Sequence, residues 1–73
     1  MKKIYRMKNL DCAHCAAKME TAIRRLDGVA DASINFMAMK LTVDFAEGAD
    51  LSAVMSEAVK VCKKVEPDCE ILL

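Results

Sequence analysis

Two cysteines stand three residues apart in the segment N-L-D-C-A-H-C-A-A-K-M-E, which runs from Asn9 to Glu20. The segment lies where an alternating, strand-like pattern gives way to apolar residues at helical spacing. Side chains at positions i and i+3 where a helix begins project to the same side, so Cys12 and Cys15 come within reach of one ion. The free N–H groups and the positive dipole end of the helix favour thiolate over thiol. Thiolates are soft ligands for Cu(I), Zn(II) and Cd(II), so this segment predicts a soft-metal site.

The predicted ligand set is too small for a structural zinc site, which normally has four protein ligands, commonly two cysteine pairs. The other two cysteines, Cys62 and Cys69, are seven residues apart and do not form a second C-x-x-C motif. An open coordination shell allows a ligand of a partner to enter before the first ligands leave. The spacing of the cysteines therefore favours metal transfer over permanent metal retention.

Asp11 precedes the first cysteine and has two readings that can coexist. Two thiolates alone balance a monovalent ion well, whereas a divalent ion prefers higher coordination and more negative charge, which an adjacent carboxylate supplies. In this reading Asp11 is a third ligand and favours Zn(II), Cd(II) or Pb(II) over Cu(I). In the other reading Asp11 only caps the helix that begins near Cys12.

Other soft or basic side chains are weaker candidates for the site. His14 lies inside the motif, but a histidine in a loop more often faces water than binds a metal. Cys62 and Cys69 follow the apolar patterns of their segments, so we expect them to be buried as small hydrophobic residues. Completion of a tetrahedral shell by one of them, or their pairing under oxidation, is the alternative. Met37 and Met39 flank a predicted turn, where loose packing is a simpler explanation than metal binding.

The periodicity of the apolar residues predicts the order βαββαβ. Gly28 is expected to stop the first helix, and Asp50 to cap the second. Such an order predicts a ferredoxin-like sandwich, in which both helices cover one face of a four-stranded antiparallel sheet. Three connections then meet at one end of the fold, where we expect the site: residues 9–14, 37–40 and 63–67. The apolar positions are Tyr5, Met7 and Leu10; Ala16, Met19, Ile23 and Leu26; Ala32, Ile34 and Phe36; Leu41, Val43 and Phe45; Leu51, Val54, Met55, Ala58 and Cys62; and Cys69, Ile71 and Leu73.

The composition limits the possible functions. The 73 residues predict a single domain, 1–73, and 55% of them are hydrophobic, which suffices for a core. Eleven basic and eleven acidic residues cancel, which argues against nucleic-acid binding. No apolar run has the length of a membrane span, and the alternating residues after Met1 argue against a signal peptide. We therefore expect a cytoplasmic location with reduced thiols.

The same motif, followed by L-D-G-V, I-N-F and L-T-V-D-F, resembles the heavy-metal-associated domain. The likeness spans essentially the whole chain. Together with the late V-E-P-D segment, it is greatest to the N-terminal domains of zinc-, cadmium- and lead-transporting P-type ATPases. The resemblance implies the βαββαβ fold, Cys12 and Cys15 as metal ligands, and Asp11 as a third ligand for divalent ions. Copper-binding members typically carry Thr or Ser at the position of Asp11, and the usual Gly-Met before the motif is Asn9-Leu10 here.

The preferred hypothesis is a module that binds Zn(II), Cd(II) or Pb(II) and transfers it by ligand exchange. Its partners would be the core domains of a membrane ATPase, and two copies bridged by one ion are a further arrangement. Such a module would not be an enzyme on its own. The alternatives are a free-standing Cu(I) metallochaperone and a thiol-disulfide oxidoreductase. Against the oxidoreductase, the chain is short, has no tryptophan near the motif, and has its only proline, Pro67, in another context.

Overall fold

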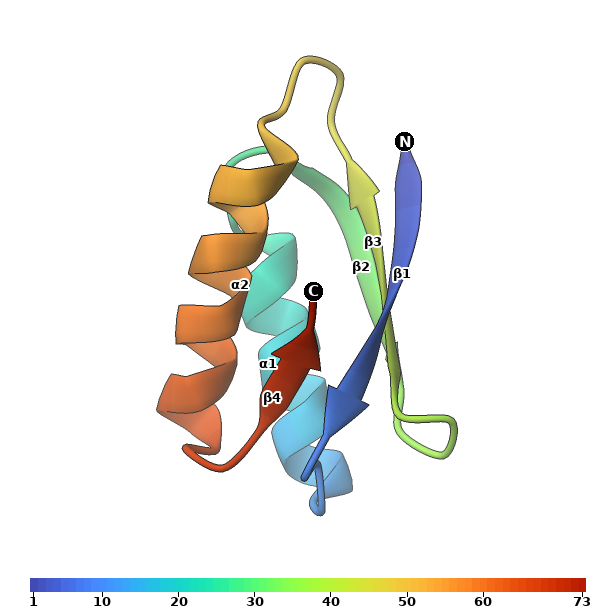
Figure 1. The fold of residues 1–73 in the computed structure, drawn as a ribbon, viewed down its shortest axis with the longest axis vertical. Coiled ribbons are helices and arrows are strands. Elements are labelled where there is room, and N and C mark those ends of the chain that lie inside the picture. The colour runs from blue at the N-terminus through green and yellow to red at the C-terminus, as the bar shows by residue number, and fades with distance from the viewer.

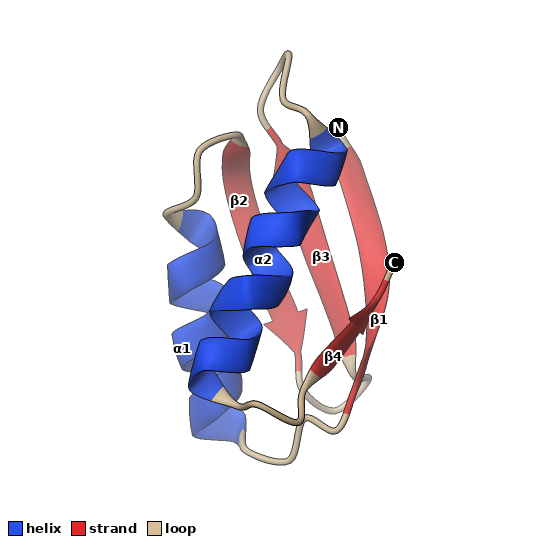
Figure 2. Cartoon of the chain, turned by 60° about the vertical axis from the view of Figure 1, so that its left-hand side comes forward, coloured by secondary structure: helices blue, strands red, loops and turns tan.

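The computed structural model describes residues 1–73 and contains four strands and two helices in the predicted order. The strands form one antiparallel sheet, and both helices pack on the same face of it (Figure 1, Figure 2). This arrangement is ferredoxin-like and confirms the predicted fold class. The elements are β1 Lys2–Lys8, α1 Ala13–Arg24, β2 Val29–Asn35, β3 Lys40–Phe45, α2 Leu51–Val65 and β4 Glu70–Leu72.

The strand order β2-β3-β1-β4 places β1 and β3 in the centre of the sheet. The β1–α1 loop, the β2–β3 turn and the α2–β4 turn lie together at the lower end of Figure 1, as expected. A hydrogen bond of 2.8 Å from the Met7 N–H to the Met39 carbonyl joins the end of β1 to the β2–β3 turn. The start of the loop that carries the two cysteines is therefore held next to the β2–β3 turn.

One hydrophobic core lies between the sheet and the helices, and it contains no buried polar or charged residue. Cys62 and Cys69 belong to this core and are each 1% exposed, which confirms their predicted burial. Asp50 is the N-cap of α2, as predicted, and its carboxylate accepts hydrogen bonds from the N–H groups of Ser52 and Ala53. Neither helix is both long and apolar enough to cross a membrane.

Three boundaries differ from the sequence prediction. The first helix ends at Arg24, before the predicted Leu26, and Gly28 lies in the turn that follows with φ of +89°. Phe36 lies in the β2–β3 turn and not in β2. Leu73 is 75% exposed and lies outside β4, because β4 pairs with β1 only along Arg6–Lys8. Without a partner strand, the alternation of buried and exposed residues is no longer imposed on Leu73.

The outer edge of β2 is covered by two side chains of α1. The Glu20 carboxylate accepts a hydrogen bond of 2.8 Å from the Ile34 N–H, and Arg24 Nε donates one of 2.8 Å to the Ala32 carbonyl. An ion pair of 3.4 Å also joins Glu20 and Arg24. Backbone groups that would otherwise be free along an edge strand are thus satisfied within the molecule.

Candidate metal site

The loop between β1 and α1 is held by its first two residues. Asn9 adopts a left-handed conformation with φ of 58°, which asparagine tolerates better than most residues. Leu10 follows and is buried in the core. The turn at Asn9 and the anchor at Leu10 fix where the chain leaves the sheet. They present the next residues, Asp11 to Cys15, at the end of the molecule.

Cys12 is the N-cap of α1, with an extended backbone, and its Sγ accepts a hydrogen bond of 3.2 Å from the Cys15 N–H. A thiol thus performs the capping role that Asp11 was predicted to perform, and the capping reading of Asp11 is wrong. The helix begins one residue later than that reading assumed, so the cap position falls on Cys12. Both cysteines are only half-buried and face the same helix end.

The two thiols have unequal acidity. A hydrogen bond from the Cys15 side chain, supported by the Cys15 N–H, lowers the pKa of Cys12. The same bond between the side chains raises the pKa of Cys15, because Cys15 holds the shared proton. Cys12 is therefore the first of the pair to ionise, and metal binding must also remove the proton that Cys15 keeps.

This inequality predicts an order of alkylation. In metal-free protein titrated with iodoacetamide from about pH 6 to about pH 10, Cys12 should react at lower pH than Cys15, because its thiolate is already present below the ordinary thiol pKa. Peptide mass spectrometry reports each site separately. Cys62 and Cys69 serve as internal controls and should stay unmodified while the protein is folded. Faster reaction of Cys15, or equal midpoints, would contradict the assigned acidities.

Asp11 is exposed and forms no hydrogen bond or ion pair. It lines a polar hollow of about 490 Å³ together with Lys63, Asp68 and Glu70, among others. The structure contains no group of three or more His, Cys, Asp or Glu side chains arranged to hold a metal ion. It brings Cys12 and Cys15 together, while a carboxylate such as that of Asp11 or Glu66 would have to move toward them to become a third ligand.

Glu66 lies near enough for its charge to act on both thiols, and it was not among the residues predicted from the sequence. Its carboxylate oxygen Oε2 is buried and has no hydrogen-bond partner. The negative charge of Glu66 raises the pKa of both cysteines. For Cys12 this partly offsets the lowering by hydrogen bonds, and for Cys15 it adds to the rise. A desolvated carboxylate oxygen without a partner is unfavourable in the free protein, and a cation on the thiolates would compensate it.

The backbone of Glu66 is fixed on both sides. Its N–H donates to the Cys62 carbonyl at 2.9 Å, and its carbonyl accepts from the Cys69 N–H at 3.0 Å. Pro67 occupies the second position of this four-residue turn, where its fixed φ is favourable. In the sequence, the only indication of a special position for Glu66 is the segment V-E-P-D, because a glutamate between a helix end and a proline lies in a turn of fixed geometry.

The remaining candidates divide into exposed and buried residues. His14 is exposed and has no hydrogen bond. Met37 is 90% exposed at the β2–β3 turn, and Met39 is partly buried against the core. Burial raises the pKa of Cys62 to about 12, with a smaller contribution from the charge of the nearby Cys69. Burial is also the main reason that the pKa of Cys69 is raised. Both core thiols therefore stay protonated and are poor ligands in the folded protein.

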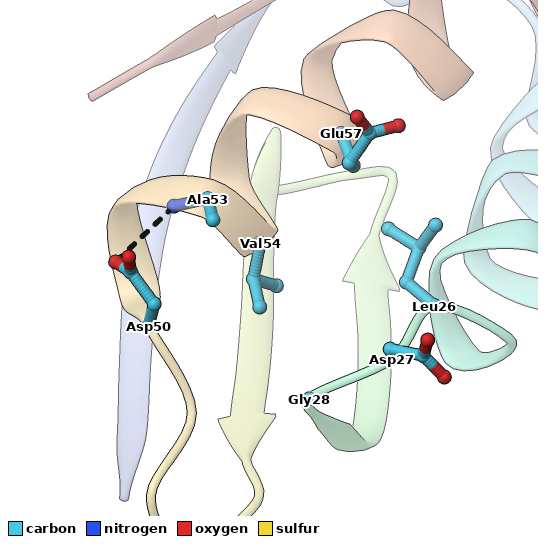
Figure 3. A pocket seen from close by; sticks show the side chains of 7 residues that line it. All are labelled: Leu26, Asp27, Gly28, Asp50, Ala53, Val54 and Glu57. Carbon is cyan, nitrogen blue, oxygen red and sulfur yellow. Dashed lines mark hydrogen bonds between the residues drawn. The ribbon is translucent and has the colours of Figure 1, made fainter.

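A second hollow, of about 520 Å³, lies at the opposite end of the fold (Figure 3). It is formed where the turn after α1 meets the start of α2, and it is lined by acidic and apolar residues without cysteine or histidine. Figure 3 shows Asp50 bound to the N–H of Ala53, so this carboxylate acts as a helix cap. This hollow therefore offers no thiolate or imidazole to a soft metal ion.

The chain is similar to a known family of domains and to several metal-transporting ATPases. The sequence profile of the Heavy-metal-associated domain matches residues 4–67. A "Cadmium, zinc and cobalt-transporting ATPase" of Bacillus subtilis (strain 168) is 33% identical over 67 residues, which cover 92% of this chain and 9% of that protein. A "Copper-transporting ATPase 1" of Rhizobium meliloti (strain 1021) is 42% identical over 48 residues, or 66% of this chain and 6% of that protein.

Solved structures agree with the fold. A "CopZ metallochaperone" superimposes with a TM-score of 0.75 at 19% sequence identity, covering 99% of this chain and 100% of that chain. The chain belongs to the heavy-metal-associated domain family, whose profile covers all but the two ends of the sequence. It spans less than a tenth of the curated ATPases it matches.

Proposed function

We propose that residues 1–73 act as one cytosolic domain that binds Zn(II), Cd(II) or Pb(II) and transfers the ion within, or to, a heavy-metal-translocating P-type ATPase. Cys12 and Cys15 supply two thiolates, and Asp11 or Glu66 supplies a carboxylate oxygen. The observation that carries the proposal is the hydrogen-bonded thiol pair, together with an unpartnered Glu66 oxygen whose charge acts on both thiols. The domain breaks no covalent bond in a substrate and is not an enzyme on its own.

The proposed mechanism is ligand exchange. The ion first meets the Cys12 sulfur, whose pKa is lowered, and then displaces the proton that Cys15 holds. The carboxylate adds negative charge that a divalent ion requires and that Cu(I) does not. Because these ligands leave the coordination shell open, a thiolate or carboxylate of the partner can bind before Cys12 and Cys15 release the ion.

A Cu(I)-binding domain is the second candidate. It is favoured by the copper-transporting relative and by the solved structure described as the N-terminal domain of a potential copper-translocating P-type ATPase of Bacillus subtilis in the Cu(I)-loaded state. That structure has 25% sequence identity and a TM-score of 0.75, and it covers 99% of this chain and 84% of that chain. The carboxylates distinguish the two candidates, because two thiolates suffice for Cu(I). The thiol-disulfide oxidoreductase hypothesis gains no support from the ferredoxin-like fold.

Replacing Glu66 with glutamine tests the oxygen ligand. We expect Glu66→Gln to weaken Zn(II) and Cd(II) binding by roughly tenfold to a hundredfold, and Cu(I) binding by less than about threefold. Competition titrations with chelators under reducing conditions measure both. The same variant should lower the pKa of Cys12 further, because an opposing negative charge is removed.

Asp68→Asn is the matched control, since it removes an exposed carboxylate from the same turn. Its divalent affinity should stay within about twofold of the unmodified protein. Equal losses in the Glu66 and Asp68 variants would show that only net charge matters, and they would remove Glu66 from the ligand set.

Replacing Asp11 with threonine tests the carboxylate that the family resemblance selects. If Asp11 turns toward the bound ion, Asp11→Thr should weaken Cd(II) and Zn(II) binding by about tenfold and leave Cu(I) binding within about twofold. Calorimetric titration of each variant gives both values. An unchanged Cd(II) affinity, together with a large loss in Glu66→Gln, would assign the oxygen ligand to Glu66 alone.

A further inference from the structure

The face of the sheet opposite the helices has one unusual row of side chains. Residues of β1 alternate between the core and this open face, and Arg6 lies on the open face. Arg6 is directly opposite Lys40 of β3 on one side and Leu72 of β4 on the other. Ile4, two residues before Arg6 on the same face, is 66% exposed, and Leu72 is 41% exposed. We call Ile4, Arg6, Lys40 and Leu72 the open-face patch.

The charges in this row are not balanced within the molecule. Two other rows of this face place a cation opposite an acid, since Lys2 faces Asp44 and Lys8 faces Glu70, and the row between Lys2 and Arg6 pairs the uncharged Ile4 and Thr42. Only the row of Arg6 places a cation opposite another cation, Lys40. Neither takes part in any of the four ion pairs of the structure. Like charges directly opposite on neighbouring strands are destabilising.

We propose that the open-face patch docks onto an acidic protein surface with an apolar centre, carried by the protein that gives or receives the metal. This inference rests on the proposed function, because it assumes such a partner. Arg6 can bind a carboxylate through two parallel N–H bonds, and Lys40 adds a second positive charge. Ile4 and Leu72 supply the apolar contact. Arginine beside exposed apolar residues is the composition typical of protein interfaces.

The position of the patch suits a metal-transfer partner. Lys40 begins β3 directly after the β2–β3 turn, whose Met39 carbonyl is bonded to Met7 near the end of β1. The patch therefore lies on the half of the sheet nearest the loop with Cys12 and Cys15, but on a separate surface. A partner bound there would leave both sulfurs uncovered at the border of the interface.

A binding experiment with defined acidic polymers tests this assignment. The probes are poly-L-glutamate and a glutamate–tyrosine copolymer, titrated into isotopically labelled protein at about 0.15 M salt, where weak long-range effects are screened. We expect the copolymer to bind more tightly and the amide shifts to concentrate at β1, β4 and the start of β3. The double variant Arg6→Glu/Lys40→Glu should lose at least about tenfold in copolymer affinity.

The matched control is Arg25→Glu/Lys64→Glu, which makes the same change in net charge at two exposed positions, the C-cap of α1 and the last turn of α2. Its copolymer affinity should fall by less than about threefold. Equal losses in the two double variants, or shifts centred on the helices, would overturn the proposal. Tighter binding to vesicles containing phosphatidylserine than to the copolymer, through the same patch, would also overturn it, because the partner would then be a lipid surface.

Two further measurements separate docking from folding and from metal binding. A single Arg6→Glu substitution places opposite charges across the strands, so it should raise the melting temperature by about 2–5 °C while weakening copolymer binding. A fall in melting temperature would give Arg6 a structural role and contradict the proposal. Cd(II) binding by Arg6→Glu/Lys40→Glu should be unchanged, because neither residue is a proposed metal ligand. If the unmodified protein fails to bind Cd(II), the proposed function is wrong, whereas the copolymer titration still tests the docking patch by itself.

Discussion

Replacing Cys12 and Cys15 together with serine is expected to weaken Cd(II) and Zn(II) binding by more than about a thousandfold, or about 4 kcal/mol. A serine hydroxyl does not ionise at neutral pH and is a harder donor than a thiolate, so the remaining carboxylates cannot hold a soft ion. Titration against competing chelators under reducing conditions measures the loss. Cd(II)–thiolate absorption in the ultraviolet reports directly whether sulfur is bound.

The fold should survive this double substitution. Cys12 caps α1 through its sulfur, and serine is among the best residues at an N-cap, so the hydrogen bond to the Cys15 position can be replaced. His14→Ala is the matched control, because it removes another possible ligand of the same loop and leaves both cysteines and Asp11 in place. We expect it to keep the metal stoichiometry and to lose less than about threefold in affinity. Tight metal retention by the double serine variant would refute the proposed site.

The largest effect on stability is expected at Gly28. Its φ of +89° is unfavourable for any residue with a side chain, and an added Cβ would lie 2.8 Å from Val54 Cγ2 and 3.2 Å from the Ala49 Cβ. Val54 is buried on α2 and has a stiff, branched side chain that cannot simply move aside. We expect Gly28→Ala to lower the free energy of unfolding by about 2–4 kcal/mol, combining backbone strain with overpacking.

Gly48 offers a matched control. Its φ of +80° is similar, but an added Cβ would meet no atom within 4 Å. Gly48→Ala should therefore cost only the backbone term, about 1 kcal/mol. Urea unfolding followed by circular dichroism measures both variants. Equal destabilisation would mean that the contact between the α1–β2 turn and α2 is not tightly packed.

The order of the elements could be predicted from the sequence because each apolar residue follows one of two periods. Met19 and Ile23 recur at helical spacing, while Leu41 and Val43 alternate with polar residues, and all four are buried. The end of the chain was harder to predict. The alternation extends to Leu73 in the sequence, but pairing with β1 stops at Leu72. The alternation of apolar residues in a short segment does not reveal how many of its residues pair with a neighbouring strand.

The candidate site could be predicted only where its residues are neighbours in sequence. The C-x-x-C spacing alone predicts that Cys12 and Cys15 lie together, and the hydrogen bond between them agrees with this. The capping role of Cys12 depends on which residue has the extended backbone, and helix boundaries shift by a residue or two without a local signal. Glu66 comes from the far end of α2, and its nearness to Cys12 results from packing the α2–β4 turn beside the start of α1. The V-E-P-D pattern predicts that Glu66 is held in a turn, but it does not say which cysteines lie near it.

The α1 side chains that cover β2 also determine how this molecule can meet others. Glu20 and Arg24 are bonded to one border of the sheet, which hinders lateral growth by main-chain pairing there. At the other border β4 pairs only with Arg6–Lys8, so the first half of β1 is the part of the sheet edge that stays open. Lys2 and Lys3 stand on that open segment, and charged side chains on an edge strand disfavour pairing with another chain.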